Sequence, residues 1–176
     1  MWSRYFTDTE GIGWTVYDNP AQDSGRGMDG DHDNGLVWET SSSFGLYAFG
    51  PTDSVGTFYD ISASIPGQMS GLSVYDSPAS SGIAVAFYLT PRVFFFEFDG
   101  GSVTYVACAD LPQTYAVGES WGLAYSEVRG TFFWSYLSQA GDLYLSELSP
   151  SGPGFDLLFG DGFESGDTGA WSEVVP

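Results

Sequence analysis

Glycine and proline are spread so evenly along this chain that few segments run beyond ten residues without one of them. The 176 residues include 24 glycines and 9 prolines. Both residue types interrupt α-helices, so the pattern leaves little room for long helices and favours short strands joined by turns. The chain has the length of one domain, and 43% of its residues are hydrophobic, enough for a core. The sequence therefore predicts a single all-β domain.

Short apolar runs between turn residues predict where the strands lie. Segments 82–90 and 92–100 are almost continuously apolar, and only Pro91 separates them. Because such runs are typical of strands covered on both faces, we expect these two in the middle of the protein. Asp99-Gly100-Gly101 predicts a tight hairpin turn into segment 102–109. Further strands are predicted at 36–41, 44–50, 55–65, 113–117, 121–128, 131–138 and 142–148.

This regular succession of short strands predicts a two-sheet antiparallel jelly-roll β-sandwich over residues 1–150. The segment SPSGPG (149–154) has the composition of a linker. We therefore expect a boundary near residue 150, with a linker and an extended C-terminal strand or assembly segment at 151–176. Trp38, Trp121 and Trp134 lie inside predicted strands and are expected in the core.

Two stretches carry a resemblance to known proteins. The run from 82 to 148 resembles the concanavalin A-like, or laminin-G-like, jelly roll of secreted bacterial proteins. In that family a strand pair is followed by Gly-x-x-Trp, here Gly118 and Trp121, and then by a strand, a glycine turn and a strand, here WGLAYSEVRGTFFWSYLSQAGDLYL. The tail DGFESGDTGAWS is similar to a recurrent DGFESGD-x-x-x-WS segment of bacterial exported proteins. The resemblance implies a jelly roll and an extracellular or cell-surface location.

The charge of the chain restricts its partners. It has 23 acidic residues, four arginines and no lysine, which gives a net charge of −19. A surface of this sign repels phosphates and anionic lipids, so we expect neither nucleic acid nor a membrane surface as partner. No apolar run approaches the roughly 18 residues of a membrane span. The first residues have no apolar signal-peptide segment, so secretion would need a leader outside this numbering.

One acidic loop has the spacing of a calcium site. Within DGDHDNG, Asp29, Asp31 and Asp33 occupy alternate positions, as ligands do in loops that bind Ca²⁺. Asn34 stands where such loops usually have glycine, and Thr40 stands at the twelfth position in place of glutamate. Ca²⁺ is the one cofactor that the sequence suggests, and the alternative is a solvated acidic loop with an exposed His32.

Glu97 and Asp99 are the one candidate pair of catalytic carboxylates. Residues two apart in a strand share a face, so both would point the same way. Laminarinase-type glycoside hydrolases carry Glu-x-Asp-x-x-Glu on such a strand, and Ser102 takes the third position here. Because glycoside hydrolysis needs two correctly separated carboxylates, we predict that the protein is not an enzyme.

The two ends of the chain carry similar strand-opening patterns, which suggests how copies could associate. Segment 5–20 and segment 159–176 both have an aromatic residue, then acids and glycines, then a tryptophan in an alternating run. A tail strand could complete the sheet edge of a neighbouring copy. The expected assembly residues are Phe163, Glu164, Trp171 and Val174, and the expected receiving residues are Phe6, Trp14 and Val16. The alternative is that the tail closes its own sandwich.

Two functions follow as hypotheses. The first is a non-enzymatic extracellular structural or adhesive subunit that self-associates head to tail, as an oligomer or filament, through its C-terminal strand. The second is a carbohydrate-binding module of the concanavalin A-like type, with a polysaccharide as partner. Flat aromatic side chains suit both, since they fill β-sandwich cores and also stack on sugar rings.

Overall fold

The structure is a computed structural model that describes residues 3–7, 14–18, 26–41, 44–51, 53, 55–76, 81–111, 117–151 and 154–162. Apart from one 3-10 turn at Ser62–Ser64, all regular structure in these residues is β-strand. The predicted all-β class is confirmed. No helix in this part of the chain is long and apolar enough to cross a membrane.

The described strands form one two-stranded sheet and three four-stranded sheets, all antiparallel. The small sheet pairs β1 (Ser3–Thr7) with β2 (Trp14–Asp18). The first large sheet has β3 (Met28–Asp31), β4 (Leu36–Ser41), β5 (Gly45–Phe49) and β6 (Thr57–Asp60). The middle sheet has β7 (Met69–Asp76), β8 (Ser81–Phe87), β9 (Thr90–Phe98) and β10 (Val103–Asp110). The last sheet has β11 (Val117–Ser126), β12 (Thr131–Ser138), β13 (Leu143–Ser151) and β14 (Gly154–Gly162).

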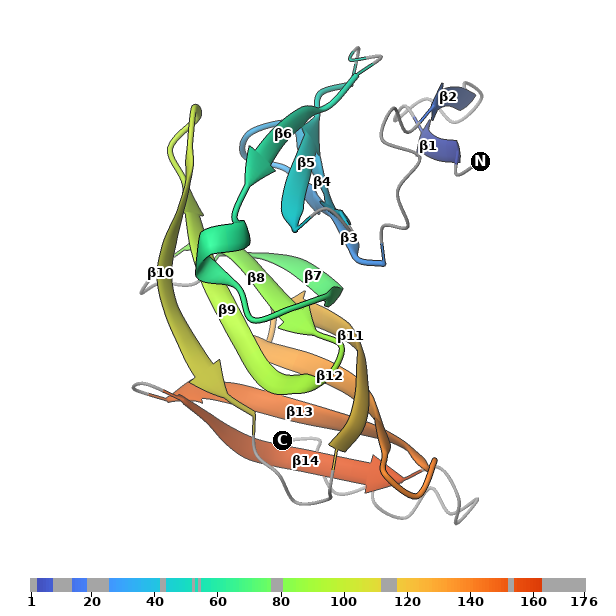
Figure 1. Cartoon of the computed structure of the whole chain (residues 1–176), viewed down its shortest axis with the longest axis vertical. Helices are drawn as coiled ribbons and strands as arrows, with labels where there is room; N and C mark the ends of the chain where they lie inside the picture. The colour runs from blue at the N-terminus through green and yellow to red at the C-terminus, as the bar shows by residue number, and fades with distance from the viewer. Residues whose placement is uncertain are drawn as a thin grey trace.

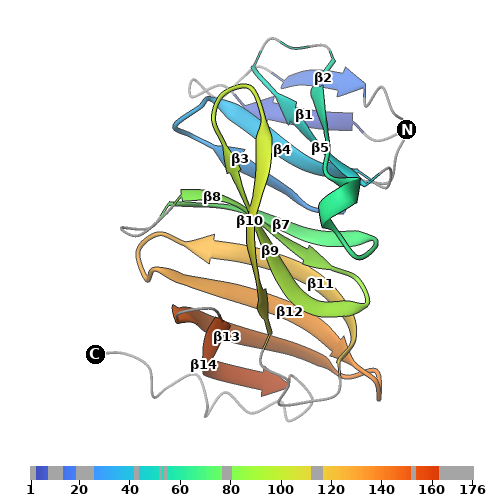
Figure 2. The same ribbon diagram turned by 60° about the vertical axis from the view of Figure 1, so that its left-hand side comes forward.

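The three large sheets stack face to face in chain order, with β1 and β2 at the N-terminal end (Figures 1 and 2). One apolar core lies between the first and middle sheets and includes Trp38, Leu46 and Phe96. A second core lies between the middle and last sheets and includes Trp134 and Leu148. The fold is therefore held together by two separate layers of buried side chains.

The middle sheet is covered on both faces, as its apolar runs predicted. Along β8, Ile83, Val85 and Phe87 point into the first core, and Ala84 and Ala86 point into the second. All five are buried. Alternate side chains of a strand point to opposite faces, so a strand between two cores has no position for a polar residue. This is the physical reason for the continuous hydrophobicity of segment 82–90.

The strand order is simpler than that of the expected jelly roll. Antiparallel sheets packed face to face, as in a β-sandwich, are confirmed. Within the described strands, however, every sheet neighbour is also a neighbour in sequence, and there are three large sheets where two were expected. Four-stranded up-and-down sheets repeated in series have the strand order of β-propeller blades. Alternation shows which side of a strand is buried, but it does not identify the strand that pairs with it.

The sheet also continues through the boundary expected near residue 150. β13 extends to Ser151, and β14 pairs with it from Ser151↔Gly154 to Tyr144↔Gly162. Strands on both sides of the expected boundary thus belong to the last sheet. Residues 154–162 belong to the stacked sheets, and residues 163–176 lie outside the described part.

Two of the three tryptophans expected in the core are there. Trp38 and Trp134 are fully buried, whereas Trp121 is 42% exposed. The pairing of β11 with β12 shifts between Ser120 and Gly122, which leaves Trp121 at the irregularity. Its ring contacts Tyr88 edge-on at 5.4 Å between centroids. The prediction for Trp121 was wrong because a β-bulge turned the side chain away from the core.

Candidate functional site

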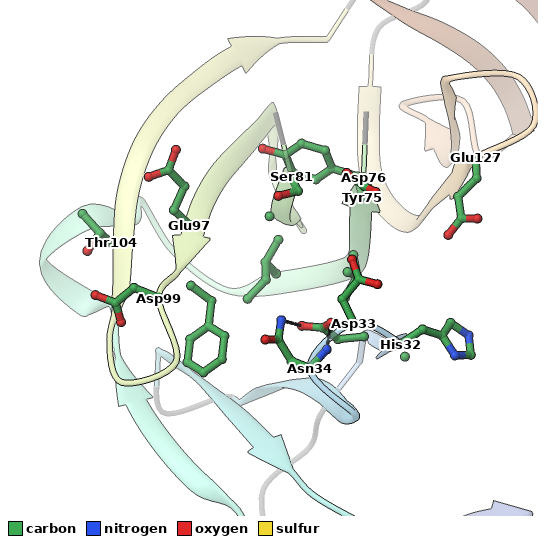
Figure 3. Close-up of a pocket in the computed structure, with 16 residues that line it drawn as sticks. His32, Asp33, Asn34, Tyr75, Asp76, Ser81, Glu97, Asp99, Thr104 and Glu127 are labelled. Atoms are coloured by element: carbon green, nitrogen blue, oxygen red, sulfur yellow. Dashed lines mark hydrogen bonds between the residues drawn. The ribbon is translucent and has the colours of Figure 1, made fainter. Parts of the chain in front are cut away.

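A hollow of about 800 Å³ opens at one end of the stacked sheets (Figure 3). Turns and strand ends from all three large sheets line it, so no single sheet forms the site. Glu97 of β9, Thr104 of β10 and Asp99 of the turn between them lie on one side, and Glu127 comes from the turn after β11 on the other (Figure 3). The β3–β4 turn contributes His32 and Asp33.

The lining is strongly acidic. Its carboxylates are Asp31, Asp33, Asp76, Glu97, Asp99 and Glu127. His32 is exposed, and neither arginine nor lysine is among the lining residues. Such a site repels phosphate and other anions, and it presents hydrogen-bond acceptors to a cation or a hydroxyl-rich ligand.

Asp76 and Glu127 also belong to this site, although neither was among the residues predicted from the sequence. Asp31 is the last residue of β3 and Asp76 the last of β7, while Glu127 directly follows β11. Each large sheet thus has an acid as the last residue of its first strand or directly after it, at the same end of the stack. A search for a repeat of about 45–50 residues would have found this, since the acids are 45 and 51 residues apart.

The three aspartates of the predicted calcium loop have different roles. The Asp31 carboxylate accepts hydrogen bonds from the Asn34 backbone N–H at 3.0 Å and from Trp38 Nε1 at 3.1 Å. Asp31 is buried, and these bonds fix the β3–β4 turn on the core tryptophan. Asp29 Oδ2 accepts from Val74 N at 2.9 Å in the middle sheet. Asp33 is exposed in the turn.

The described residues contain no group of three or more acidic, histidine or cysteine side chains placed to hold a metal ion. Asp29 and Asp31 use their carboxylates for hydrogen bonds within the protein, and calcium would compete with those donors. The calcium site at Asp29, Asp31 and Asp33 stays a prediction from the sequence.

The candidate catalytic pair lies in the hollow, and one of its members supports a turn. Asp99 Oδ1 accepts hydrogen bonds from the backbone N–H groups of Gly101 at 2.9 Å and Ser102 at 2.7 Å. These bonds hold the pKa of Asp99 below its usual value because they favour the ionised carboxylate. Gly100 has φ of +91°, so the predicted Asp-Gly-Gly hairpin turn is confirmed. Glu97, which directly precedes Phe98 in β9, is exposed.

The residues expected to take part in assembly are only partly described. Phe163, Glu164, Trp171 and Val174 lie outside the described residues. The expected receiving residues all lie in the small sheet, where Thr15, the residue between Trp14 and Val16, pairs with Phe6. The structure thus brings the three receiving positions together on adjacent strands.

Comparison with known proteins identifies no family. No protein-family model matches the chain, and no curated protein matches it in sequence. Solved structures do match in fold. The chain is similar to a crystal structure of a nidogen/laminin complex, with 16% sequence identity and a TM-score of 0.61 over 84% of this chain and 52% of that one.

Two further solved structures give the same result. One is a proposed 6-phosphogluconolactonase from Bacteroides uniformis, with 12% identity and a TM-score of 0.56 over 90% of this chain and 50% of that one. The other is a mitotic checkpoint complex, with 13% identity and a TM-score of 0.53 over 86% of this chain and 43% of that one. The chain spans about half the length of the chains it matches. At these identities the likeness supports the all-β fold alone.

Proposed function

We propose that this protein is a non-enzymatic, extracellular structural or adhesive subunit that self-associates head to tail through its C-terminal strand. The observation that carries the proposal is the small sheet. The other described sheets have four strands each, whereas β1 and β2 pair only with each other among the described strands. A two-stranded sheet is marginally stable in water, so a further strand would stabilise it.

The tail of a second copy has the right character to supply that strand. Its AWSEVV segment alternates as a strand does, and it resembles the sequence of β2 with its leading glycine and tryptophan. Such a contact joins two different surfaces, so it continues into a filament unless its geometry closes a ring. In this proposal Phe163 and Trp171 fill apolar slots of the next copy, beside Phe6, Trp14 and Val16.

Charge and chemistry support the remaining parts of the proposal. The net charge of −19 suits a protein that must stay soluble outside the cell, and the tail resembles a segment of bacterial exported proteins. Asp99 uses its carboxylate to build a turn, which leaves Glu97 without a second free carboxylate on its strand. A non-enzymatic role fits this arrangement.

Removing the tail is expected to abolish assembly without unfolding the protein. We expect light scattering to show oligomers or filaments for the full chain and monomers for a chain stopped after Gly162, which keeps every described strand. Trp171→Ala should have a similar effect, because losing a buried tryptophan costs about 3–5 kcal/mol. Trp121→Ala is the matched control, because Trp121 lies in β11, outside the tail, and its side chain is half-exposed. A full chain that stays monomeric at high concentration contradicts the proposal.

A second candidate function rests on the acidic hollow. Its volume is within the range of small-ligand sites, and Phe98 and Tyr75 add aromatic surface to its carboxylates. We therefore propose a hydroxyl-rich glycan as the alternative partner. Asp76→Asn is expected to weaken laminarin or dextran binding about tenfold in titration calorimetry, the effect of losing one charged hydrogen bond.

The control for this test is Asp110→Asn, a change at an exposed carboxylate that does not line the hollow. Equal binding by Asp76→Asn and the unsubstituted chain would contradict a glycan site in the hollow. Release of reducing sugar that Glu97→Gln abolishes would contradict the non-enzymatic role.

A further inference from the structure

The first strands of the three large sheets contact one another in the same way each time. A Cβ atom added at Gly27 in front of β3 would lie 2.5 Å from Leu72 N and 2.8 Å from the Gly71 carbonyl carbon in β7. A Cβ added at Gly71 would lie 2.7 Å from Leu123 N and 3.0 Å from the Gly122 carbonyl carbon in β11. Each first strand thus places a glycine directly against the backbone of the next first strand, where no side chain fits.

A hydrogen bond repeats along the same strands. Asp29 stands two residues after its glycine, and its carboxylate accepts from Val74 N at 2.9 Å. Ser73 stands two residues after Gly71, and its hydroxyl oxygen accepts from Tyr125 N at 2.8 Å. The first strands of adjacent sheets are therefore joined each time by a glycine contact and a hydrogen bond. A further first strand could make the same contacts.

The sequence supplies a further copy of this strand. β11 and the turn after it read Ala-Tyr-Ser-Glu-Val at 124–128, and the tail reads Ala-Trp-Ser-Glu-Val at 170–174. Gly122 stands two residues before the first copy, and Thr168 stands two residues before the second, followed by Gly169. The interval between the copies is 46 residues, since 170 − 124 = 46, and the earlier glycines Gly27, Gly71 and Gly122 are 44 and 51 residues apart.

We propose that residues 169–174 form the first strand of a fourth layer, held on the last sheet of the same molecule by a contact between Gly122 and the backbone of Thr168 and Gly169. Tyr125 reaches back to Tyr75 of the preceding sheet, at 6.1 Å between ring centroids. Trp171 occupies the equivalent position in the tail, so its ring lies on the last sheet near Ala124 and Phe133.

The surface that receives the tail carries a group of apolar side chains. On β12 the even-numbered aromatic residues point into the second core, so Phe133 and Leu137 belong to the opposite face. Leu143 and Leu145 pair with positions of that face, and Leu143 is 45% exposed. Phe133 of this face also pairs with Glu147, whose carboxylate accepts hydrogen bonds from Arg129 and Thr131, so polar groups lie at one end of it. Covering the apolar part with a further strand would remove its side chains from water.

The chain has enough length to reach this position. Seven residue steps separate the end of β14 at Gly162 from Gly169, and seven also separate the end of β10 at Asp110 from Val117 at the start of β11. Seven extended residues span about 24 Å. Crossing one four-stranded sheet and one layer needs about 17 Å, from strand spacings of about 4.8 Å and a layer spacing of about 10 Å.

The hydrogen-bond acceptor of the earlier first strands is missing in β11. Where the earlier strands carry Asp29 and Ser73 as hydrogen-bond acceptors, β11 carries the exposed Ala124. The tail is therefore held by the glycine contact and by apolar packing alone. Ala124→Ser would restore the acceptor and is expected to hold the tail more firmly.

This inference does not depend on self-association. A strand has faces and edges: residues 169–174 can pack one face, with the Trp171 ring, on their own last sheet. In that arrangement only Phe163 and the open strand edge are left to contact β1 and β2 of another copy. The experiment must therefore be done on the full chain at a dilution where scattering shows monomers, or on its monomeric fraction.

Hydrogen–deuterium exchange read by mass spectrometry tests the placement. In the monomer we expect the amides of 170–174 to exchange at least about tenfold more slowly than an unstructured peptide. Ala124→Arg puts a long charged side chain on the receiving face and should remove this protection. Ala107→Arg, at an exposed alanine of β10, is the matched control and should leave it unchanged. Ala124→Ser should increase it.

The exchange rates show whether residues 170–174 lie on their own last sheet, on another copy, or on neither. Exchange of 170–174 at the unprotected rate in the monomer would overturn the inference, and so would protection that Ala124→Arg leaves intact. Protection that appears only in oligomers would also overturn it while supporting the proposed strand donation between copies. Protection in a protein that never assembles would support this inference and contradict the proposed function.

Discussion

Gly71→Val is expected to destabilise the protein by about 3 kcal/mol or more, enough to leave a marginally stable domain largely unfolded. The new Cβ would lie 2.7 Å from Leu123 N and 3.1 Å from Leu123 Cβ. These atoms belong to the backbone of β11 or are attached directly to it, so no side-chain rotation relieves the overlap. The middle and last sheets would have to separate, which would open the second core. Urea unfolding followed by circular dichroism measures the loss.

Gly30→Ala is the matched control for this change. Gly30 lies in β3, and a Cβ added there would meet no atom within 4 Å. We expect its free energy of unfolding to stay within about 0.5 kcal/mol of the original value. A Gly71→Val protein as stable as this control would show that the first strands are not in backbone contact.

Arg129→Ala is expected to lower the free energy of unfolding by about 2–3 kcal/mol at neutral pH. Arg129 donates to both carboxylate oxygens of Glu147, from Nε at 2.6 Å and from Nη2 at 2.9 Å. The Glu147 side chain is only 6% exposed, so the substitution leaves a buried charge with Thr131 as its remaining hydrogen-bond donor. Breaking a buried pair costs about 3–5 kcal/mol, and we expect less here because Arg129 is 42% exposed to screening water.

The effect of Arg129→Ala should shrink in acid. Hydrogen bonds from Arg129 hold the pKa of Glu147 below its usual value, against the opposing effect of burial. A lowered folded-state pKa contributes stability above the unfolded pKa of about 4.3, and that contribution is lost as pH falls through the folded pKa. Below that range both proteins carry a neutral Glu147, so the difference between their free energies of unfolding narrows. Unfolding curves at pH 7 and pH 3 test this, and a difference that does not vary with pH contradicts the assignment.

Local sequence features predicted the strands and their burial well, because those properties depend on neighbours within a few residues. The runs at 82–90 and 92–100 lie in the doubly covered middle sheet, and Asp99-Gly100-Gly101 forms its turn. The boundary expected near residue 150 rested on composition alone, which does not reveal that β13 and β14 pair from Ser151↔Gly154 onward.

The candidate site shows what local sequence features could not predict. Glu97 and Asp99 were identified together because they are close in the chain, and both do line the hollow. Asp76 and Glu127 were missed because they meet the others only through the stacking of three sheets. The calcium loop also had the expected spacing, but spacing did not reveal that Asp31 bonds Trp38 or that Asp29 bonds the middle sheet.

Local sequence was enough to predict that this chain forms short, amphipathic or fully apolar strands ended by glycine, proline and aspartate. These properties depend on backbone freedom and side-chain alternation, which act over a few residues. Packing between distant segments set the rest: each large sheet consists of four consecutive strands, and the sheets stack through Gly27, Gly71 and Gly122. A strand's alternation is compatible with many partners. The choice among them depends on which backbones can approach without a side chain between them, and that is settled only when residues 44 and 51 positions apart meet.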